Sequence, residues 1–279
     1  MSRLDPPPAA SGFNPTPAAA GFNPIPAAAA LHAVHQKRGT VLPLDPAIAP
    51  RTEADGAAVQ FALANLVGAS PPVGFKIGAT GKRMQEYLGI DGPVAGFMER
   101  ANVHPTHADL RFSDFINPGV ECEVAVRLAK DLPPGPCSPQ QAADAVGDFV
   151  AAMEIVENRY DDLKTLGTPT LIGDQMYHAA AVVGALGGVD WRTLNTGALR
   201  GRISVDGTLR DEGVTADLMG HPFNCLAWLA ASSVAAAFGG LKAGQVVLLG
   251  SVVPPIWLSG PGTITVEFPP LPKVSLRLA

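Results

Sequence analysis

The stretch Val120-Glu121-Cys122-Glu123-Val124-Ala125-Val126-Arg127-Leu128 is the most informative part of this chain. Its apolar and polar residues alternate, which predicts a β-strand. Because successive strand side chains point to opposite faces, Glu121 and Glu123 share a face and Cys122 points away from them. Two adjacent carboxylates repel each other unless something neutralises them. A hard divalent cation such as Mg²⁺, Mn²⁺ or Ca²⁺ would do so, since these ions prefer oxygen ligands. A pair of glutamates on a solvated strand face is the alternative.

A third carboxylate, Glu154, lies in the apolar run Ala151-Ala152-Met153-Glu154-Ile155-Val156. A carboxylate is rarely buried among apolar residues without a partner. We therefore expect Glu154 to be the third ligand of the cation. Three carboxylates would leave coordination positions open for water and substrate, as a catalytic site requires.

The segments around these acids predict one β-rich α+β domain without regular βαβ alternation. Thr52 is a candidate helix N-cap, and Ser138 with Gln141 has the signature of a capping box. Asp206-Gly207 is typical of a hairpin turn. We expect helices over 52–66, 138–150 and 222–238, and strands over 74–78, 121–128, 150–157, 182–184, 202–205, 245–249, 264–268 and 274–278.

The N-terminal segment has a different composition. It contains a near-duplicate, Gly12-Phe13-Asn14-Pro15-Thr16-Pro17-Ala18-Ala19-Ala20 followed by Gly21-Phe22-Asn23-Pro24-Ile25-Pro26-Ala27-Ala28-Ala29. Proline at this density interrupts helices and sheet ladders. We expect residues 1–28 to form a disordered Pro/Ala-rich tail, or alternatively an arm that docks a partner, and residues 29–279 to form a single catalytic domain. The first helix is expected from about Ala29 to His35.

Composition excludes several classes of protein. The chain has 279 residues, 47% of them hydrophobic, which is enough for one sizeable core. Its net charge of −5 argues against a nucleic-acid surface, which needs clustered Lys and Arg. The three cysteines have no metal-like spacing and fit a reducing cytoplasm better than a disulfide framework. We expect neither a membrane span nor a signal peptide.

Six segments of the chain occur in a characteristic order. They are Gly74-Phe75-Lys76-Ile77-Gly78, Leu88-Gly89-Ile90-Asp91-Gly92-Pro93, Glu121-x-Glu123, Glu154-Ile155-Val156, Gly220-His221-Pro222-Phe223-Asn224 with Ala227-Trp228-Leu229-Ala230, and Leu241-Lys242-Ala243-Gly244-Gln245-Val246-Val247-Leu248. Together they resemble the 2-keto-4-pentenoate hydratase family. That family includes 2-oxohepta-3-ene-1,7-dioate hydratases and 4-oxalocrotonate decarboxylases, and it belongs to the fumarylacetoacetate hydrolase superfamily. The resemblance covers about residues 30–279.

This resemblance implies a fold, a cofactor and a set of site residues. The implied fold is α+β, a mixed β-roll with flanking helices, and the implied cofactor is Mg²⁺ or Mn²⁺ in a homo-oligomer. The expected metal ligands are Glu121, Glu123 and Glu154. The resemblance implies catalytic roles for Lys76, Asp91 and Asp174, and a position near the substrate carboxylate for Ser251. Tyr177 and His178 depart from the family pattern, and we expect them to line the pocket and contact the substrate.

The resemblance also implies a reaction. A 2-oxo acid can chelate a metal through its C1 carboxylate and C2 oxygen, and the metal then stabilises the enolate. We expect a lyase that adds water to a 2-hydroxy-2,4-dienoate in aromatic catabolism. A decarboxylase of a 2-oxo-3-enedioate would use the same electron sink and is the alternative. An acylpyruvate hydrolase is less favoured, because the chain lacks the Asn-Tyr-x-x-His element of those hydrolases.

Individual residues keep structural alternatives. Lys76 could stabilise the substrate's charge or deliver a proton, or it could be a strand lysine that reaches solvent. Asp91 could orient Lys76 or cap a turn. Tyr177-His178 and the bulky segment 252–257 depart from the family pattern, which leaves the exact substrate open. His221, before Pro222, is expected to cap a helix.

Overall fold

The strand that carries Glu121 and Glu123, β5 (Pro118–Leu128), lies in the middle of a curled, mixed sheet. The computed structural model describes residues 21–279, except for the side chains of Arg83, Tyr87 and Lys164. The strand order is β2-β1-β10-β5-β6-β7-β3, and β11 also pairs with β5. These strands are β1 (Gly74–Gly78), β2 (Val94–Met98), β3 (Val103–His104), β6 (Val146–Glu157), β7 (His178–Val183), β10 (Val246–Ser251) and β11 (Ile256–Trp257).

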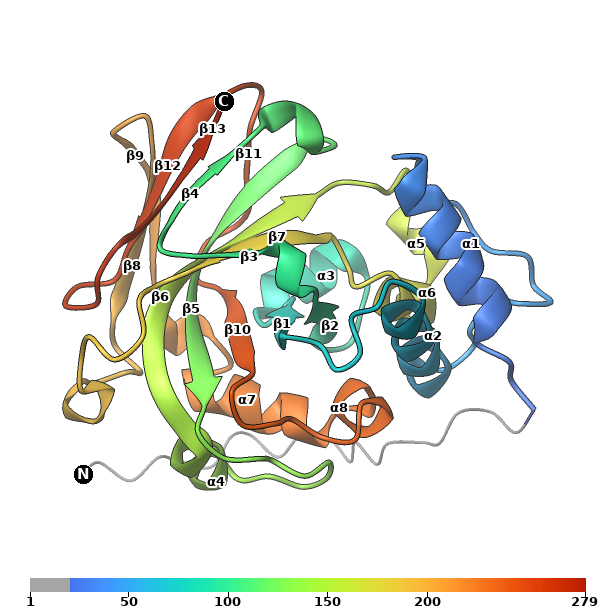
Figure 1. The fold of residues 1–279 in the computed structure, drawn as a ribbon, viewed down its shortest axis with the longest axis horizontal. Helices are drawn as coiled ribbons and strands as arrows, with labels where there is room; N and C mark the ends of the chain where they lie inside the picture. Colours follow the sequence, from blue (N-terminus) through green and yellow to red (C-terminus); the bar gives the residue numbers. More distant parts are fainter. Residues whose placement is uncertain (1–20) are drawn as a thin grey trace.

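A second sheet packs against the convex side of the first. Its order is β4-β13-β12-β8-β9, and it contacts β5, β6 and β7 (Figure 1). The strands are β4 (His107–Leu110), β8 (Arg200–Val205), β9 (Thr208–Val214), β12 (Gly262–Glu267) and β13 (Val274–Leu278). Asp206 and Gly207 both have positive φ between β8 and β9, as the predicted hairpin turn requires.

The curl of the first sheet creates an enclosed inner face. β2 and β7 contact each other although four strands lie between them in the sheet order. A small apolar cluster fills the space that they enclose: Met98, Ala125, Val150, Ala152, Ala181, Val183 and Leu248. Glu121 and Glu123 share the face of Ala125, and Glu154 shares that of Ala152, since residues two apart on a strand line one face. The three glutamates therefore point into the curl.

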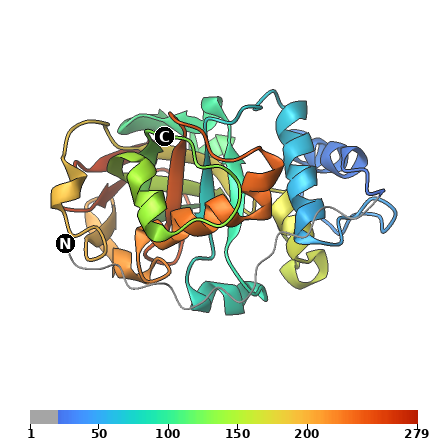
Figure 2. The same cartoon turned by 90° about the horizontal axis from the view of Figure 1, so that it is seen from below.

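Helices cover the remaining surfaces. They are α1 (Ile25–Gln36), α2 (Glu53–Leu66), α3 (Lys82–Leu88), α4 (Pro139–Ala145), α5 (Leu163–Leu166), α6 (Thr168–Gly173), α7 (Pro222–Ala231) and α8 (Ser233–Ala237), with single 3₁₀ turns at Arg100–Asn102, Phe112–Asp114, Trp191–Thr193 and Thr215–Asp217. Figures 1 and 2 show α1, α2, α5 and α6 gathered on one side of the curled sheet, away from the second sheet. The predicted α+β roll with flanking helices is confirmed. Within residues 21–279, no helix has the length and apolar character that crossing a membrane requires.

The N-terminal boundary at residue 28 is wrong, because α1 already begins at Ile25. Pro24 is its N-cap and Pro26 lies in its first turn, where a missing N–H has no helical partner to lose. Ala27 and Ala28 are buried in the main core together with Leu31. The second copy of the near-duplicate thus forms the start of a packed helix. Residues 1–20, with most of the expected tail, lie outside the described residues.

Two helix predictions were too long. The helix opened by Ser138 ends at Ala145, and β6 begins at Val146, because the chain there pairs with β5. The predicted helix over 222–238 is interrupted at Ser232, whose hydroxyl accepts a hydrogen bond from the Ala235 N–H and so caps α8. His221 caps α7 as expected, since its ring Nδ1 accepts from the Phe223 N–H.

Candidate metal and substrate site

Three glutamates meet on the inner face of the curl. Glu121 and Glu154 are directly paired across β5 and β6, and Glu123 is two residues farther along β5. One carboxylate oxygen from each lies within 4.8 Å of the other two. Glu123 and Glu154 are fully buried, and Glu121 is half-buried. The juxtaposition depends on strand register, because a slip by one residue would turn Glu154 to the opposite face.

The two buried glutamates each have one oxygen held by the protein and one left over. Glu123 Oε2 accepts from the Gly250 N–H at 2.9 Å, and Glu154 Oε1 lies 2.8 Å from His178 Nδ1. Glu123 Oε1 and Glu154 Oε2 are buried and have no hydrogen-bond partner among the described residues. A buried carboxylate oxygen without a donor is costly. Oxygens that converge without donors fit a hard divalent cation, which needs acceptor atoms only.

The electrostatics of the group point the same way. Burial, followed by the charge of Glu154, raises the pKa of Glu121 to about 8. Burial and the two neighbouring glutamates raise the pKa of Glu123 well above its usual range. Burial also acts to raise the pKa of Glu154, but Lys76 and His178 outweigh it and the net pKa is lowered. The protein by itself thus neutralises only part of this charge, and either protons or a cation must supply the rest.

Lys76 lies beside the three glutamates. It is buried in β1, and its Nζ is 3.6 Å from Glu154 Oε1. The same Nζ donates a hydrogen bond of 2.5 Å to the carbonyl of Met176. This geometry removes the alternative of a lysine that reaches solvent. It places an ammonium beside the carboxylate of Glu154.

The carbonyl that receives Lys76 belongs to a strained turn. Gln175, Met176 and Tyr177 have φ values of 61°, 33° and 61°, three consecutive non-glycine residues in the left-handed region. Such a conformation costs about 1–3 kcal/mol for each residue and persists only where its surroundings enforce it. The turn brings the Met176 carbonyl to Lys76 and leads directly to His178. We define residues 175–177 as the left-handed turn.

Asp174 holds this turn in place. Its carboxylate is fully buried and contacts His35 of α1, the guanidinium of Arg159 and the hydroxyl of Tyr160. Burial acts to raise the pKa of Asp174, but Arg159 and His35 outweigh it and the net pKa is lowered. This carboxylate therefore contacts residues that hold the turn in place, and it contacts none of the three glutamates. The predicted catalytic role of Asp174 stays a prediction.

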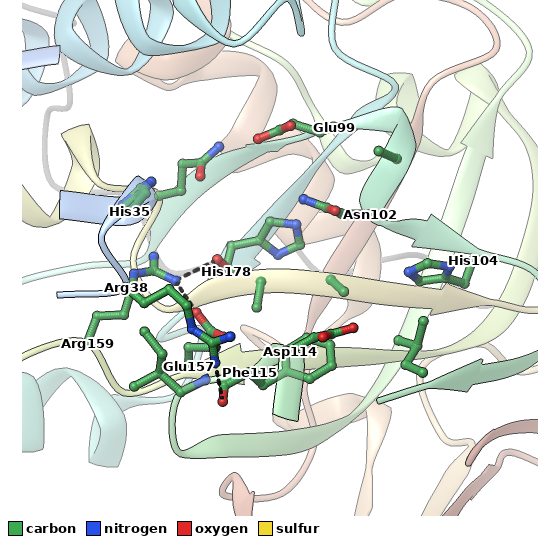
Figure 3. A pocket seen from close by; sticks show the side chains of 16 residues that line it. His35, Arg38, Glu99, Asn102, His104, Asp114, Phe115, Glu157, Arg159 and His178 are labelled. Atoms are coloured by element: carbon green, nitrogen blue, oxygen red, sulfur yellow. Dashed lines mark hydrogen bonds and ion pairs between the residues drawn. The ribbon is translucent and has the colours of Figure 1, made fainter. Parts of the chain in front are cut away.

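His178 connects the glutamates to a cavity. Its Nδ1 contacts Glu154, while its Nε2 is buried without a partner among the described residues. The cavity has a volume of about 400 Å³, and its wall is mixed in charge. Figure 3 shows His178 in that wall, with the Arg159 guanidinium bonded to its backbone carbonyl. The labelled side chains are His35, Arg38, Glu99, Asn102, His104, Asp114, Phe115, Glu157, Arg159 and His178.

The two remaining predicted site residues, Ser251 and Asp91, lie in different places. Ser251 pairs with Glu123 in the sheet, but its hydroxyl donates to the Val253 carbonyl at 2.7 Å and accepts from the Cys122 N–H at 3.1 Å. Asp91 is exposed in the turn before β2, where it adds to the effect of burial in raising the pKa of Glu53. No hydrogen bond or ion pair among the described side chains joins Asp91 to Lys76 or to the glutamates.

The sequence reasoning missed Arg159 and His35. Arg159 is buried and binds Glu157, Asp174 and two backbone carbonyls, and it therefore ties the end of β6 to the left-handed turn. A signal was available, because a charged Glu157-Asn158-Arg159 run follows directly after a buried strand. His35 comes from a helix of low polarity far away in the sequence, and nothing in its local pattern predicts the contact with Asp174.

Comparison with known proteins identifies the family. The fumarylacetoacetate (FAA) hydrolase C-terminal family matches residues 77–278. The chain belongs to the fumarylacetoacetate hydrolase family. Its relatives include a 2-hydroxyhexa-2,4-dienoate hydratase of Comamonas testosteroni, 31% identical over 210 residues that cover 70% of this chain and 78% of the relative. A 4-oxalocrotonate decarboxylase of a Pseudomonas species is 30% identical over 180 residues, 64% of this chain and 68% of the relative.

Solved structures share this fold. A 4-oxalocrotonate decarboxylase from Pseudomonas putida G7, complexed with magnesium and adipate, superposes with a TM-score of 0.82 at 21% identity, covering 95% of this chain and 100% of that one. A fumarylpyruvate hydrolase from Pseudomonas aeruginosa, in complex with Mn²⁺ and pyruvate, gives a TM-score of 0.57 at 15% identity, covering 74% and 88%. This chain is thus a family enzyme related to hydratases and decarboxylases of aromatic catabolism.

Proposed function

We propose that the chain is a metal-dependent lyase that adds water to a 2-hydroxy-2,4-dienoate and yields a 4-hydroxy-2-oxo acid. The observation that carries this proposal is the set of converging glutamate oxygens, two of which are buried without a donor among the described residues. Glu121, Glu123 and Glu154 would hold Mg²⁺ or Mn²⁺. The hydratase relatives at about 30% identity support the reaction, because they act on substrates of this class by name.

The cation would supply one kind of chemistry, polarisation of the C2 oxygen of a bound 2-oxo acid. The protein's own residues would do the rest. Lys76 has an ammonium held by Glu154 and by the Met176 carbonyl, and it would lie beside the acid group of a substrate bound at the glutamates. From that position it can stabilise negative charge or deliver a proton to the dienoate carbon chain.

His178 and the cavity offer a source of water. The cavity of about 400 Å³ is large enough for several water molecules, and His178 lies in its wall with an unpartnered Nε2. Water addition requires a solvent molecule on the substrate side of the glutamates. The inner apolar cluster fills the space beside the glutamates, so water would arrive from the side of His178 and the cavity.

A second candidate activity is decarboxylation of a 2-oxo-3-enedioate. It is favoured by the fold agreement with the decarboxylase of TM-score 0.82 and by a decarboxylase relative at 30% identity. Both reactions need the same cation and the same stabilised charge at the C2 oxygen. They differ in the step away from the metal: the hydratase adds water to the carbon chain, and the decarboxylase releases the far carboxylate as CO₂.

The test is an assay of the purified chain with 2-hydroxypenta-2,4-dienoate. Formation of 4-hydroxy-2-oxopentanoate should require Mg²⁺ or Mn²⁺, and excess chelator should abolish it. A parallel assay with 2-oxohex-3-enedioate measures release of CO₂. If the chain released CO₂ from 2-oxohex-3-enedioate and did not hydrate 2-hydroxypenta-2,4-dienoate, the decarboxylase would be the correct assignment. Turnover that persists unchanged in chelator would contradict both.

A further inference from the structure

We call the end of the curl at Gly119 of β5 its mouth, since the inner apolar cluster fills the curl farther along that strand. The mouth has an aromatic residue that the proposed chemistry does not use. Trp257 in β11 is 49% exposed, which is unusual for an indole of this size. β11 pairs with the beginning of β5, so that Trp257 lies opposite Gly119. Gly119 is two residues before Glu121 on the same strand. Trp257 therefore lies beside β5 just before the glutamates on that strand.

The indole covers the glutamate face of β5. A Cβ built on Gly119 would lie 2.9 Å from the Trp257 ring and 3.0 Å from the Val156 side chain. Residue 119 shares its face with Glu121 and Glu123, since side chains two apart on a strand point the same way. The ring therefore overlies the inner face, and glycine at 119 is what leaves room for it.

A second aromatic side chain joins Trp257 at the mouth. The Tyr177 ring lies 6.3 Å from that of Trp257 and 4.7 Å from that of Tyr160, centroid to centroid. Tyr177 belongs to the strained left-handed turn, which is fixed by Asp174, so its position is enforced rather than free. We call the rings of Trp257 and Tyr177, together with the Val156 side chain beside them, the aromatic rim.

The rim lies at the distance of a substrate tail. Two residues of a β-strand span about 7 Å, which is comparable with the length of a five-carbon acid. An acid whose C1 and C2 oxygens lie at the glutamates would therefore bring C5 and its substituent to the rim. Trp257 and Tyr177 offer apolar ring surface there, and an apolar substituent gains by leaving water.

The buried cations on this side are already engaged. Arg159 is shared between Glu157 and Asp174, and Lys76 is held by Glu154 and the Met176 carbonyl. A second carboxylate at the far end of a substrate would meet ring surface and an exposed edge, and it would lose hydration without gaining one of these cations. These two buried cations thus do not favour a dicarboxylate in this place.

We propose that the aromatic rim binds the apolar tail of a 2-oxo acid and makes the site selective for monocarboxylates with an apolar end over dicarboxylates. This inference takes one premise from the proposed function, namely that the acid group of the substrate lies at the glutamates. It favours the hydratase over the dioate decarboxylase.

A binding experiment tests the inference apart from turnover. Affinities of 2-oxohexanoate and 2-oxoadipate, which differ by a terminal carboxylate, are measured by calorimetry in the presence of Mn²⁺. The monocarboxylate should bind at least about tenfold more tightly, as expected for a hydrophobic subsite. Trp257→Ala should remove about tenfold of this ratio, and Trp257→Phe should retain most of it. Leu209→Ala, which shortens another exposed apolar side chain on the second sheet, should leave the ratio unchanged.

The outcomes separate the two proposals. A preference for 2-oxohexanoate without hydration of 2-hydroxypenta-2,4-dienoate would overturn the proposed function and leave the rim intact. Hydration with equal affinities, or with a preference for 2-oxoadipate, would overturn the rim. It would also be overturned if neither acid bound, or if Trp257→Ala changed the sedimentation-derived subunit number and left the ratio unchanged, because Trp257 would then be a subunit contact.

Discussion

His178 Nδ1 lies 2.8 Å from Glu154 Oε1, and this contact determines which oxygen of Glu154 is free. An ionised carboxylate can only accept, so Nδ1 carries the proton and donates it. The second oxygen, Oε2, is left buried and unpartnered among the described residues. The imidazole therefore fixes the orientation of the Glu154 carboxylate, and in the proposed metal site Oε2 would be the oxygen that binds the cation.

Removal of this imidazole should weaken metal binding. Partners that orient a ligand typically contribute 10- to 100-fold to affinity. We expect His178→Ala to raise the Kd for Mn²⁺, measured by electron paramagnetic resonance, by about that factor, and His178→Gln to restore part of the loss through its amide N–H. His107→Ala, which alters a histidine bonded to Ser275 on the second sheet, is the control. Equal Kd values in all variants would show that His178 does not orient a ligand.

Lys76→Met should separate metal binding from turnover. The ammonium is 3.6 Å from Glu154 Oε1 and competes with a cation for that carboxylate. We expect Mn²⁺ affinity to stay equal or increase, while kcat falls by about 10²–10³-fold, the usual cost of losing one charge-stabilising donor. Paired Mn²⁺ titrations and steady-state assays measure this. A lysine with only a packing role would instead lower thermal stability and leave kcat close to that of the natural chain.

Glu123→Gln should stabilise the protein without metal and abolish its response to metal. Burial and two neighbouring glutamates raise the pKa of Glu123, so the charged form is unfavourable there. The amide oxygen can still accept from the Gly250 N–H, which keeps the fold contact. Relief of about 1 kcal/mol corresponds to about 2–4 °C in a protein of this size. Calorimetric Tm values with and without Mn²⁺ decide it, and a Tm that still rises with Mn²⁺ in the variant would contradict the ligand assignment.

Asp174→Asn should destabilise the fold in a pH-dependent way. The carboxylate is fully buried, and Arg159 and His35 lower its pKa in the folded state. Its contribution is fully present above the unfolded pKa of about 3.9 and is lost as the pH falls through the lower folded value. Removal of one partner of a buried pair costs about 3–5 kcal/mol, so urea unfolding at pH 7 should show a loss of that order. The difference from the natural chain should shrink below about pH 4. A constant difference at all pH values would rule out the charged network.

The central strands and their faces were readable from the chain, whereas no strand was predicted at β2, β3, β4 or β11. Alternation around Glu121 and Glu123 predicted β5 and the shared face correctly, because side-chain direction on a strand follows from local geometry alone. Caps were predicted equally well at Thr52, Ser138 and His221, since each cap is a contact within a few residues. The helix that was expected to reach residue 150 ends earlier, because a long-range contact decides its end. From Val146 onward the chain pairs with β5 as a strand.

The sequence by itself determined which acids could share a strand face and where the helices capped by Thr52, Ser138 and His221 begin, and it predicted a cation at the acids. Only the tertiary structure decided that Glu154 stands opposite Glu121, that His178 and Lys76 hold its Oε1, and that Trp257 covers Gly119 at the mouth. These contacts join residues far apart in the chain. They depend on strand register and on the closure of the curl, and neither is encoded in the local pattern of any single segment.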